Sequence, residues 1–183
     1  GYAVARAALE MGAEVILISG PVCLETPPVA KVVRVTSAQE MLMAVENEIS
    51  RTDIFISVAA VADYRARNAS PQKTKKTNDN MTLELTPNPD ILEYVAGLLN
   101  PPFCVGFAAE TENLEENAQA KRQRKKLPLL AANLAQDTIG AEDCVLTLFD
   151  DAGKHLLSKA PKLEQARRLI RHASLLYDEH QKR

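Results

Sequence analysis

The sequence predicts an α/β fold in three layers, with helices on both faces of a mostly parallel sheet. Apolar runs of strand length alternate with segments of helical periodicity, and short links join them. This order favours right-handed crossovers between neighbouring parallel strands. The 183 residues, of which 46% are hydrophobic, suit one domain with a substantial core. We therefore expect residues 1–183 to form a single domain.

The N-terminal segment predicts a helix followed by two strands. Residues 2–13 carry alanines at helical spacing, which leave a small-residue face for close packing, and Gly12 is a C-terminal cap. EVILIS at 14–19 is apolar and β-branched, as a buried strand requires. VVRV at 32–35 predicts the next short strand.

A second helix and a third strand follow. Ser37 and Glu40 form a capping box at the start of a helix over 37–49, in which each side chain satisfies a backbone N–H. DIFISVAAV at 53–61 is apolar on consecutive positions, which is typical of a strand buried on both faces.

The same alternation resumes in the second half of the chain. We expect strands at 81–86, 102–110 and 127–133, helices at 89–99 and 112–126, and a β-hairpin at 144–158 that turns around Gly153. The closing helix spans 161–180, with Pro161 in its first turn. Its apolar stripe predicts packing against the sheet and comprises Leu163, Ala166, Leu169, Ile170, Ala173, Leu176 and Tyr177.

Composition limits the classes of function. A formal net charge of −2 argues against a sequence-independent nucleic-acid binder. No apolar run is long enough to cross a bilayer, and no segment has the pattern of a signal peptide. Cys23, Cys104 and Cys144 are far apart and set in apolar runs, which indicates reduced core thiols. We therefore expect a cytoplasmic protein that binds neither nucleic acid nor membrane.

The three histidines do not predict a metal site. His155, His172 and His180 lie late in the chain and share no ligand spacing with the cysteines. From the sequence, a zinc site is therefore not expected.

Small or polar residues follow each strand that leads toward a helix. They are Ser19-Gly20, the segment 59–63, the segment 108–111 and Asn133. In open α/β sheets, ligands bind beyond the carboxyl ends of the strands. One such segment alone could simply ease a turn, but four at the same edge favour a ligand site there.

A nicotinamide-dependent oxidoreductase is the first alternative for such a site. An NAD enzyme commonly places Asp or Glu at the end of its second strand, where this sequence has Ile18-Ser19-Gly20. No tyrosine is followed four residues later by a lysine, as proton transfer in a short-chain reductase requires. The oxidoreductase is therefore kept as the alternative.

Lysines and arginines gather in two places. Lys73, Lys75 and Lys76 follow Asp63 on a polar loop, and a second cluster at 121–126 ends a helix. The loop could be merely exposed, and the helical cluster could merely complement the helix dipole, worth about 0.3–1 kcal/mol. Alternatively, both clusters face a polyanionic ligand such as a nucleoside triphosphate with Mg²⁺.

Five blocks in a fixed order carry a family resemblance. They are AAVADYR, KTKK, NPDIL, GFAAET, and KRQRKK running into LLAAN. With them, the sequence resembles the bacterial phosphopantothenate–cysteine ligases (phosphopantothenoylcysteine synthetases). In most bacteria this ligase is the C-terminal half of a bifunctional coenzyme A biosynthesis protein, whose N-terminal half is a flavin-dependent decarboxylase. The resemblance runs from Gly1 nearly to the C-terminus.

The resemblance implies a fold and a reaction. The fold is a Rossmann-like domain that forms a homodimer, and segment 81–86 and the late hairpin are the candidate pairing edges. The reaction uses CTP as co-substrate, with Mg²⁺, to convert 4′-phosphopantothenate into an acyl-cytidylate. The amine of L-cysteine then displaces CMP. FMN belongs only to the decarboxylase half.

The resemblance also assigns roles to individual residues. Lys73 is implied in forming the acyl-cytidylate, and Ala59 lines the reacting intermediate. Asp63 is a nucleotide-contacting acid that could also hold Mg²⁺. The other implied nucleotide contacts are Ser57, Val58, Pro89, Asp90, Ile91, Leu92, Phe107, Lys121 and Lys125. Asn133 is a further candidate at the edge of the pocket.

The sequence departs from the family in three places. Leu134 stands where the family usually has an aspartate, and Thr74 stands where an isoleucine is common. The family's glycine-rich segment, which supplies an asparagine and phosphate-binding amides, would lie before Gly1. The chain as given is therefore expected to be inactive alone in the complete ligase reaction.

Overall fold

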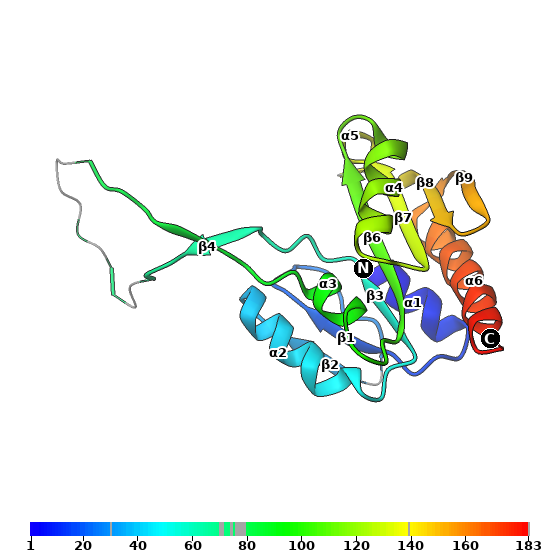
Figure 1. The fold of residues 1–183 in the computed structure, drawn as a ribbon, viewed down its shortest axis with the longest axis horizontal. Coiled ribbons are helices and arrows are strands. Elements are labelled where there is room, and N and C mark those ends of the chain that lie inside the picture. The colour runs from blue at the N-terminus through cyan, green and yellow to red at the C-terminus, as the bar shows by residue number, and fades with distance from the viewer. Residues whose placement is uncertain (30, 70–71, 74, 76–79, 139, 183) are drawn as a thin grey trace.

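The computed structural model describes residues 1–29, 31–69, 72–73, 75, 80–138 and 140–182. Its central sheet has the strand order β3-β6-β7-β8-β9 (Figure 1). β3 (Ile54–Ser57), β6 (Phe103–Glu110) and β7 (Leu129–Leu134) are parallel, and β8 (Asp143–Asp150) and β9 (Gly153–Pro161) extend the sheet as an antiparallel hairpin. β1 (Ile16–Ser19) and β2 (Lys31–Arg34) form a separate parallel pair. The predicted α/β fold class is confirmed.

Helices cover both faces of the central sheet, as predicted. One layer holds α1 (Tyr2–Glu10) and α6 (Lys162–His180), and the other holds α2 (Ala38–Ile49), α3 (Ile91–Ala96) and α4 (Leu114–Arg124). A single turn, α5 (Ala135–Thr138), follows β7 and was not predicted. Every position of the predicted α6 stripe packs in the cluster on the α1 and α6 side.

The two-residue period of β6 divides the core between these layers. Phe103 and Val105 point toward α1 and α6, while Cys104 and Ala108 point toward α3 and α4. All four are nearly inaccessible to solvent, because β6 has a strand on each side and helices on both faces. Burial also raises the pKa of the Cys104 thiol to about 11, so Cys104 is an inert core residue.

The structure has all three helix-end features that the sequence predicted, and two of them differ in detail from the prediction. Gly12 has a φ of +86°, which suits the left-handed cap after α1. Ser37 Oγ accepts a hydrogen bond from Glu40 N at 3.2 Å, and the Glu40 carboxylate reaches back to accept a hydrogen bond from Thr36 N at 2.7 Å. Pro161 is the N-cap of α6, so it lies just before the helix and not in its first turn, where it was predicted.

The strands on either side of the lysine loop differ most from prediction. Only the last part of the expected strand 81–86 is found, as β5 (Leu85–Pro87), which pairs with an unpredicted β4 (Tyr64–Ala66). β3 ends at Ser57, and its residues are half-buried because β6 is its only pairing partner among the described residues. Both faces of β3 pack on the core as predicted, Ile54 and Ile56 on the α1 and α6 side and Phe55 on the other side, but the open edge leaves these residues only half-buried.

The β4–β5 ladder forms an arm that projects away from the body of the domain (Figure 1). One further backbone hydrogen bond, from Arg67 N to Glu84 O, extends this ladder by a residue on each strand. The described residues between Arg67 and Glu84, which include Lys73, therefore lie beyond the paired part of the arm.

Two expectations about surfaces can be checked directly. Cys104 and Cys144 are buried, as predicted, but Cys23 is exposed because it lies in the loop between β1 and β2. None of the helices in the described part of the chain combines the length and apolarity that a membrane crossing requires.

We predict that Gly106→Ala destabilises the domain. A Cβ at Gly106 would lie 2.7 Å from Leu127 Cδ1, 3.0 Å from Leu92 Cδ2 and 3.1 Å from Leu130 Cδ1. Such overpacking should lower the free energy of unfolding by about 1–3 kcal/mol in urea denaturation. Gly20→Ala is the matched control, since no atom lies within 4 Å of its added Cβ. Equal stability of the two variants would contradict the tight packing of α3 and β7 on β6.

Candidate functional site

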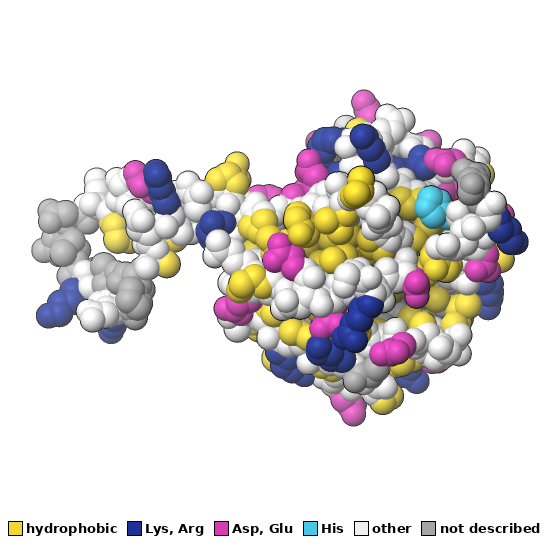
Figure 2. Space-filling view, turned by 60° about the horizontal axis from the view of Figure 1, so that its bottom comes forward, with side chains coloured by type: hydrophobic (Ala, Val, Ile, Leu, Met, Phe, Trp, Pro, Cys, Tyr) yellow, Lys and Arg dark blue, Asp and Glu magenta, His cyan; other side chains and the backbone are white. Residues whose placement is uncertain are grey.

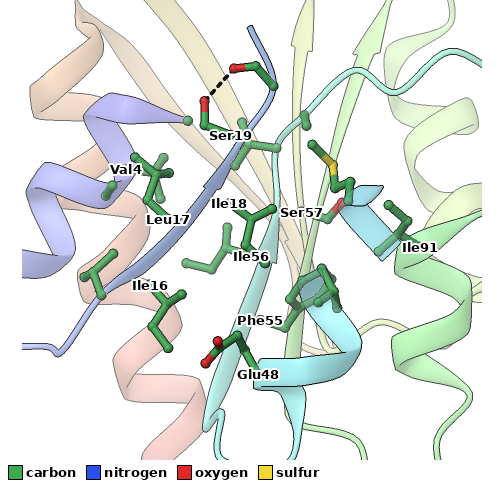
Figure 3. Close-up of a pocket in the computed structure, with 18 of the residues that line it drawn as sticks. Val4, Ile16, Leu17, Ile18, Ser19, Glu48, Phe55, Ile56, Ser57 and Ile91 are labelled. Carbon is green, nitrogen blue, oxygen red and sulfur yellow. Dashed lines mark hydrogen bonds between the residues drawn. The ribbon is translucent and has the colours of Figure 1, made fainter. Parts of the chain in front are cut away.

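A cavity of about 1430 Å³ lies between β1 and β3 (Figure 3). Ile16, Leu17 and Ile18 line one wall, and Phe55 and Ile56 line the other. Segment 57–62 and Ser19 extend the lining to the carboxyl ends of both strands. The cavity therefore combines an apolar floor with a polar mouth at the edge where the sequence predicted a ligand site.

The two strands that border this cavity present unpaired backbone edges. Among the described residues, β1 pairs with β2 and β3 pairs with β6, so the edges that face each other make no ladder. Both strands run in the same direction, as Ile16 to Ile18 and Phe55 to Ser57 show in Figure 3. Two parallel edges across an apolar groove are the geometry that accepts one further parallel strand.

The last residue of β3 and the segment after it carry four of the predicted site residues. Ser57 and Val58 are half-buried, Ala59 is exposed, and all three line the cavity. Asp63 is exposed and lies outside the cavity lining, although its carbonyl accepts a hydrogen bond from Asn88 N at 2.7 Å.

Two residues that the sequence reasoning missed hold this segment in place. Arg65 Nη1 donates to Pro87 O at 2.6 Å and to Asn88 Oδ1 at 3.1 Å. Asn88 Nδ2 donates to Ala62 O at 2.8 Å. Both residues line the cavity and tie the base of the arm to its mouth. They lie within the AAVADYR and NPDIL blocks, so a signal for them was present.

Asp90 joins the start of α3 to the end of α4. Its Oδ1 accepts the Glu93 N–H at 3.0 Å and caps the helix, and its Oδ2 accepts a hydrogen bond from Lys125 Nζ. Only 6% of the Lys125 side chain is exposed. The helical cluster is therefore not just a solvated helix end, because Lys125 is an ion-paired, buried residue.

Lys121 lies one turn before Lys125, where the sequence placed it. Its Nζ donates to Phe107 O at 2.7 Å. Burial, together with the positive charge of Lys125, lowers the pKa of Lys121 below its usual value. Its charge is thus disfavoured in the free protein, and an anionic ligand beside it would stabilise the ammonium.

Burial and hydrogen bonding shift the pKa of the Asp90 carboxyl in opposite directions. Burial acts to raise the pKa of its carboxyl, but the hydrogen bonds from Lys125 and from Glu93 N outweigh it and hold the pKa below the ordinary value. Asp90 therefore stays ionised at neutral pH and keeps Lys125 paired.

Not all predicted site residues face the cavity with their side chains. Ile91 lines the cavity and also packs in the cluster on the α3 and α4 side, whereas Leu92 lies in that cluster and outside the cavity lining. Phe107 packs on the α1 and α6 side, the opposite face of the sheet from the α4 layer that carries Lys121. Their proposed contacts with a nucleotide remain predictions.

The lysine loop and Asn133 complete the predicted set. Lys73 and Lys75 are exposed, and Lys76 and Thr74 lie outside the described residues. Asn133, on β7, is half-buried, and its side-chain amide donates to Leu134 O at 3.1 Å. The structure thus brings together the cavity mouth and the arm base but leaves Lys73 apart on the arm.

Similar proteins identify the family of this domain. The family model described as "DNA/pantothenate metabolism flavoprotein C-terminal domain" matches residues 1–176. The coenzyme A biosynthesis bifunctional protein CoaBC of Escherichia coli is 44% identical over 190 residues, covering 100% of this chain and 47% of that protein. CoaBC of Vibrio cholerae is 45% identical over 168 residues, covering 88% of this chain and 42% of that protein. The chain thus spans less than half the length of these relatives.

Solved structures share the fold. The crystal structure of the C-terminal domain of CoaBC superposes with a TM-score of 0.80 at 34% identity, covering 97% of this chain and 82% of that chain. A Cab2 mutant in complex with phosphopantothenate-cysteine has a TM-score of 0.79 at 16% identity, covering 100% of this chain and 79% of that chain. At 16% identity, the similarity to the Cab2 structure supports the fold only.

We predict that Asp90→Ala destabilises the domain more than loss of a helix cap explains. A lost cap costs about 1 kcal/mol, and an unpaired ammonium left at Lys125 brings the expected total to about 3 kcal/mol in urea denaturation. The double variant Asp90→Ala/Lys125→Met should recover all but the cap loss, since it buries no charge. Asp63→Ala, at an exposed carboxylate, is the control and should stay within about 0.5 kcal/mol of the parent.

The same pair predicts a pH dependence. Because the folded pKa of Asp90 is depressed, its contribution is present above the unfolded pKa of about 3.9 and is lost as the pH falls through the folded pKa. The stability difference between the parent and Asp90→Ala should therefore shrink in acid. A constant difference, or a double variant as unstable as Asp90→Ala, would show that the ion pair has no such role.

Proposed function

Because the chain belongs to the DNA/pantothenate metabolism flavoprotein C-terminal domain family, we propose that it carries the ligase half of coenzyme A biosynthesis. The reaction joins 4′-phosphopantothenate to L-cysteine with CTP as co-substrate. The observation that carries this proposal is the 44–45% identity to relatives named coenzyme A biosynthesis bifunctional proteins. FMN, in this proposal, belongs to the decarboxylase half of the longer protein.

The first step is the activation of a carboxylate. A carboxylate oxygen of 4′-phosphopantothenate attacks the α-phosphorus of CTP, and pyrophosphate leaves. Two anions must meet, so positively charged groups at the developing charge lower the barrier. Lys121 fits this need because its charge is disfavoured until an anion approaches. We assign Lys73 to the same step.

The second step is acyl transfer. The cysteine amine attacks the acyl carbon, the bond to the cytidylate breaks, and CMP leaves while the amine loses a proton. Ser57, Val58 and Ala59 line the cavity mouth with little side-chain bulk, which lets a flat mixed anhydride approach the backbone. Small residues at strand ends commonly serve this purpose.

Asp63 suits a magnesium ion that arrives with the nucleotide. Mg²⁺ commonly uses one or two carboxylates together with substrate phosphates and keeps several waters. An exposed carboxylate at the cavity side of the arm matches such a partial site. The ion would supply positive charge to the triphosphate there.

A homodimer follows from the arm in this proposal. Met81, Leu83 and Leu85, of which only Leu85 lies in β5, are 75%, 61% and 56% exposed. Tyr64 on the facing strand is 60% exposed. Figure 2 shows the arm standing apart from the body, with hydrophobic side chains gathered on the body near its base. Pairing of two arms would cover these groups.

The groove between β1 and β3 has an occupant in this proposal. The family segment expected before Gly1 would supply one parallel strand and end in the glycine-rich loop at the cavity mouth. The unpaired edges of β1 and β3 and the greater length of the relatives support it. The strand would fill the apolar floor and leave the mouth for substrates.

The oxidoreductase alternative has no support among the similar proteins described above. Ser19, which stands where such enzymes commonly hold the ribose, donates its hydroxyl to Gly20 O at 2.9 Å. A cytoplasmic location and the lack of nucleic-acid binding remain predictions from composition. Equilibrium binding of CTP, ATP and NADPH separates the classes: preference for CTP supports the ligase, and preference for NADPH refutes it.

In a longer chain that includes the glycine-rich segment expected before Gly1, we predict that Lys73→Gln abolishes pyrophosphate release from CTP and 4′-phosphopantothenate. The glutamine keeps most of the length of the side chain but removes the charge that balances the triphosphate. Loss should be at least about 100-fold in kcat, by analogy with other groups that stabilise transition-state charge. Lys75→Gln, two residues away and also exposed, is the control and should retain most activity. Near-parental pyrophosphate release by Lys73→Gln would refute its role.

We predict that Leu83→Glu converts a dimer into a monomer. Two like charges would then meet at the pairing face of the arms, where the parent buries leucines. Sedimentation equilibrium measures the change, because the dimer dissociation constant rises about tenfold for each 1.4 kcal/mol of association free energy lost. Leu99→Glu is the matched control, because Leu99 is 95% exposed and lies away from the arm. A dimer that persists in Leu83→Glu would exclude arm pairing.

A further inference from the structure

A carboxylate and two imidazoles converge at the opposite edge of the central sheet from the cavity mouth. Asp150 ends β8, His155 lies on β9 and His172 lies on α6. His172 Nε2 is 2.7 Å from Asp150 Oδ2, and His155 Nε2 is 3.0 Å from each carboxylate oxygen. One ligand atom from each residue lies within 4.8 Å of the other two. Spacing along the chain did not reveal this cluster, because His155 and His172 lie 17 positions apart.

The position of the carboxylate is fixed by the hairpin turn. Asp150 Oδ1 accepts backbone hydrogen bonds from Ala152 N at 2.8 Å and from Gly153 N at 3.1 Å. Only 2% of the Asp150 side chain is exposed, whereas the side chains of His155 and His172 are 37% and 25% exposed. The carboxylate is therefore rigid, and the imidazoles are accessible to a solute.

The donor set and its spacing match a borderline divalent transition metal. Two imidazole nitrogens and one carboxylate are the ligands of many zinc sites, with metal–ligand distances near 2.0–2.2 Å. In a tetrahedron of that size, neighbouring ligand atoms lie about 3.4 Å apart. The two N···O distances fall within about 0.7 Å of this value, so rotation of the part-exposed rings suffices to admit an ion.

The surrounding charges also allow a cation here. With neutral imidazoles, the cluster carries one negative charge from Asp150. The cations on either side already have acidic partners: Arg122 pairs with Asp151, and Lys154 pairs with Glu115. A divalent ion would thus enter a site of net negative charge and would not meet an unpaired cation from these two residues.

We propose that Asp150, His155 and His172 form a zinc-class metal site with a fourth position open to water. Each histidine would bind through Nε2: the ion takes the place of the proton that Nε2 now donates to the Asp150 carboxylate, and the neutral ring then carries its proton on Nδ1. Because the three ligands come from β8, β9 and α6, the ion cross-links the hairpin to the closing helix. The site is separate from the proposed Mg²⁺–nucleotide site, which uses oxygen ligands at the other edge of the sheet.

The test is titration of the full chain with Co²⁺, a zinc substitute with visible absorption bands. The chain is first freed of metal with EDTA, and excess Mg²⁺ is added to occupy oxygen-only sites. Cys23→Ser serves as the background, since Cys23 is an exposed thiol that could bind Co²⁺ itself. We expect one Co²⁺ per chain with the intense bands of four-coordination, displacement by Zn²⁺, and a raised melting temperature.

Single substitutions locate the ion. His172→Gln and His155→Gln should each weaken Co²⁺ binding by at least about 100-fold, since even an outer partner of a metal ligand costs 10–100-fold. His180→Gln is the matched control: it lies on the same helix, with its ring 6.1 Å from Phe103, and should bind as the parent does.

Three results would overturn the site. These are no saturable Co²⁺ binding in the Cys23→Ser background, unchanged affinity in both cluster variants, or equal weakening by His180→Gln. Urea midpoints measured in EDTA show whether each variant folds. His155→Gln alters the more exposed of the two rings, so it keeps the test decisive if His172→Gln does not fold.

Discussion

The close approach of α3 and the α4–β7 connection to β6 is the constraint on which the candidate site depends. Gly106 has no side chain, so Leu92, Leu127 and Leu130 pack directly on the strand. This contact sets the height of α3 and of the end of α4 above the sheet. Asp90 and Lys125 meet because of it, with the Lys125 side chain buried and the Asp90 side chain 44% exposed.

That packing also explains why Lys121 is suited to anionic ligands. Lys121 lies one turn from the buried Lys125 and donates to the β6 carbonyl of Phe107. Burial and a neighbouring cation disfavour its charge, while Asp90 is already engaged by Lys125. A cation whose positive charge is only partly balanced in the free protein would be stabilised by the negative charge of a bound polyphosphate.

Two surfaces in the described part of the chain have exposed apolar side chains or unpaired backbone edges, which are features that bind other segments of protein. The arm leaves a row of alternating apolar side chains exposed, and β1 and β3 leave facing backbone edges across an apolar groove. Each is costly in water, because unpaired backbone groups and apolar faces favour association. In the function proposed above, a second arm would cover the first surface and one further parallel strand would fill the second.

Sequence patterns by themselves determined the helices, most strands and the edge of the sheet where the cavity mouth lies. The two-residue period of β6 and the stripe of α6 depend on local spacing, which burial of one face imposes directly. The short β5 was overestimated because its alternating leucines satisfy the strand pattern without a partner along their whole length.

Only the tertiary structure decided which charged and polar side chains meet. Lys125 lies in a run of cations that resembles a solvated helix end, and its burial follows from the position of Asp90, 35 residues earlier. Likewise, Asp150, His155 and His172 converge because the hairpin folds back on itself and α6 packs across it. Periodicity reports which face of an element is buried, but it carries no information about which distant groups share that face.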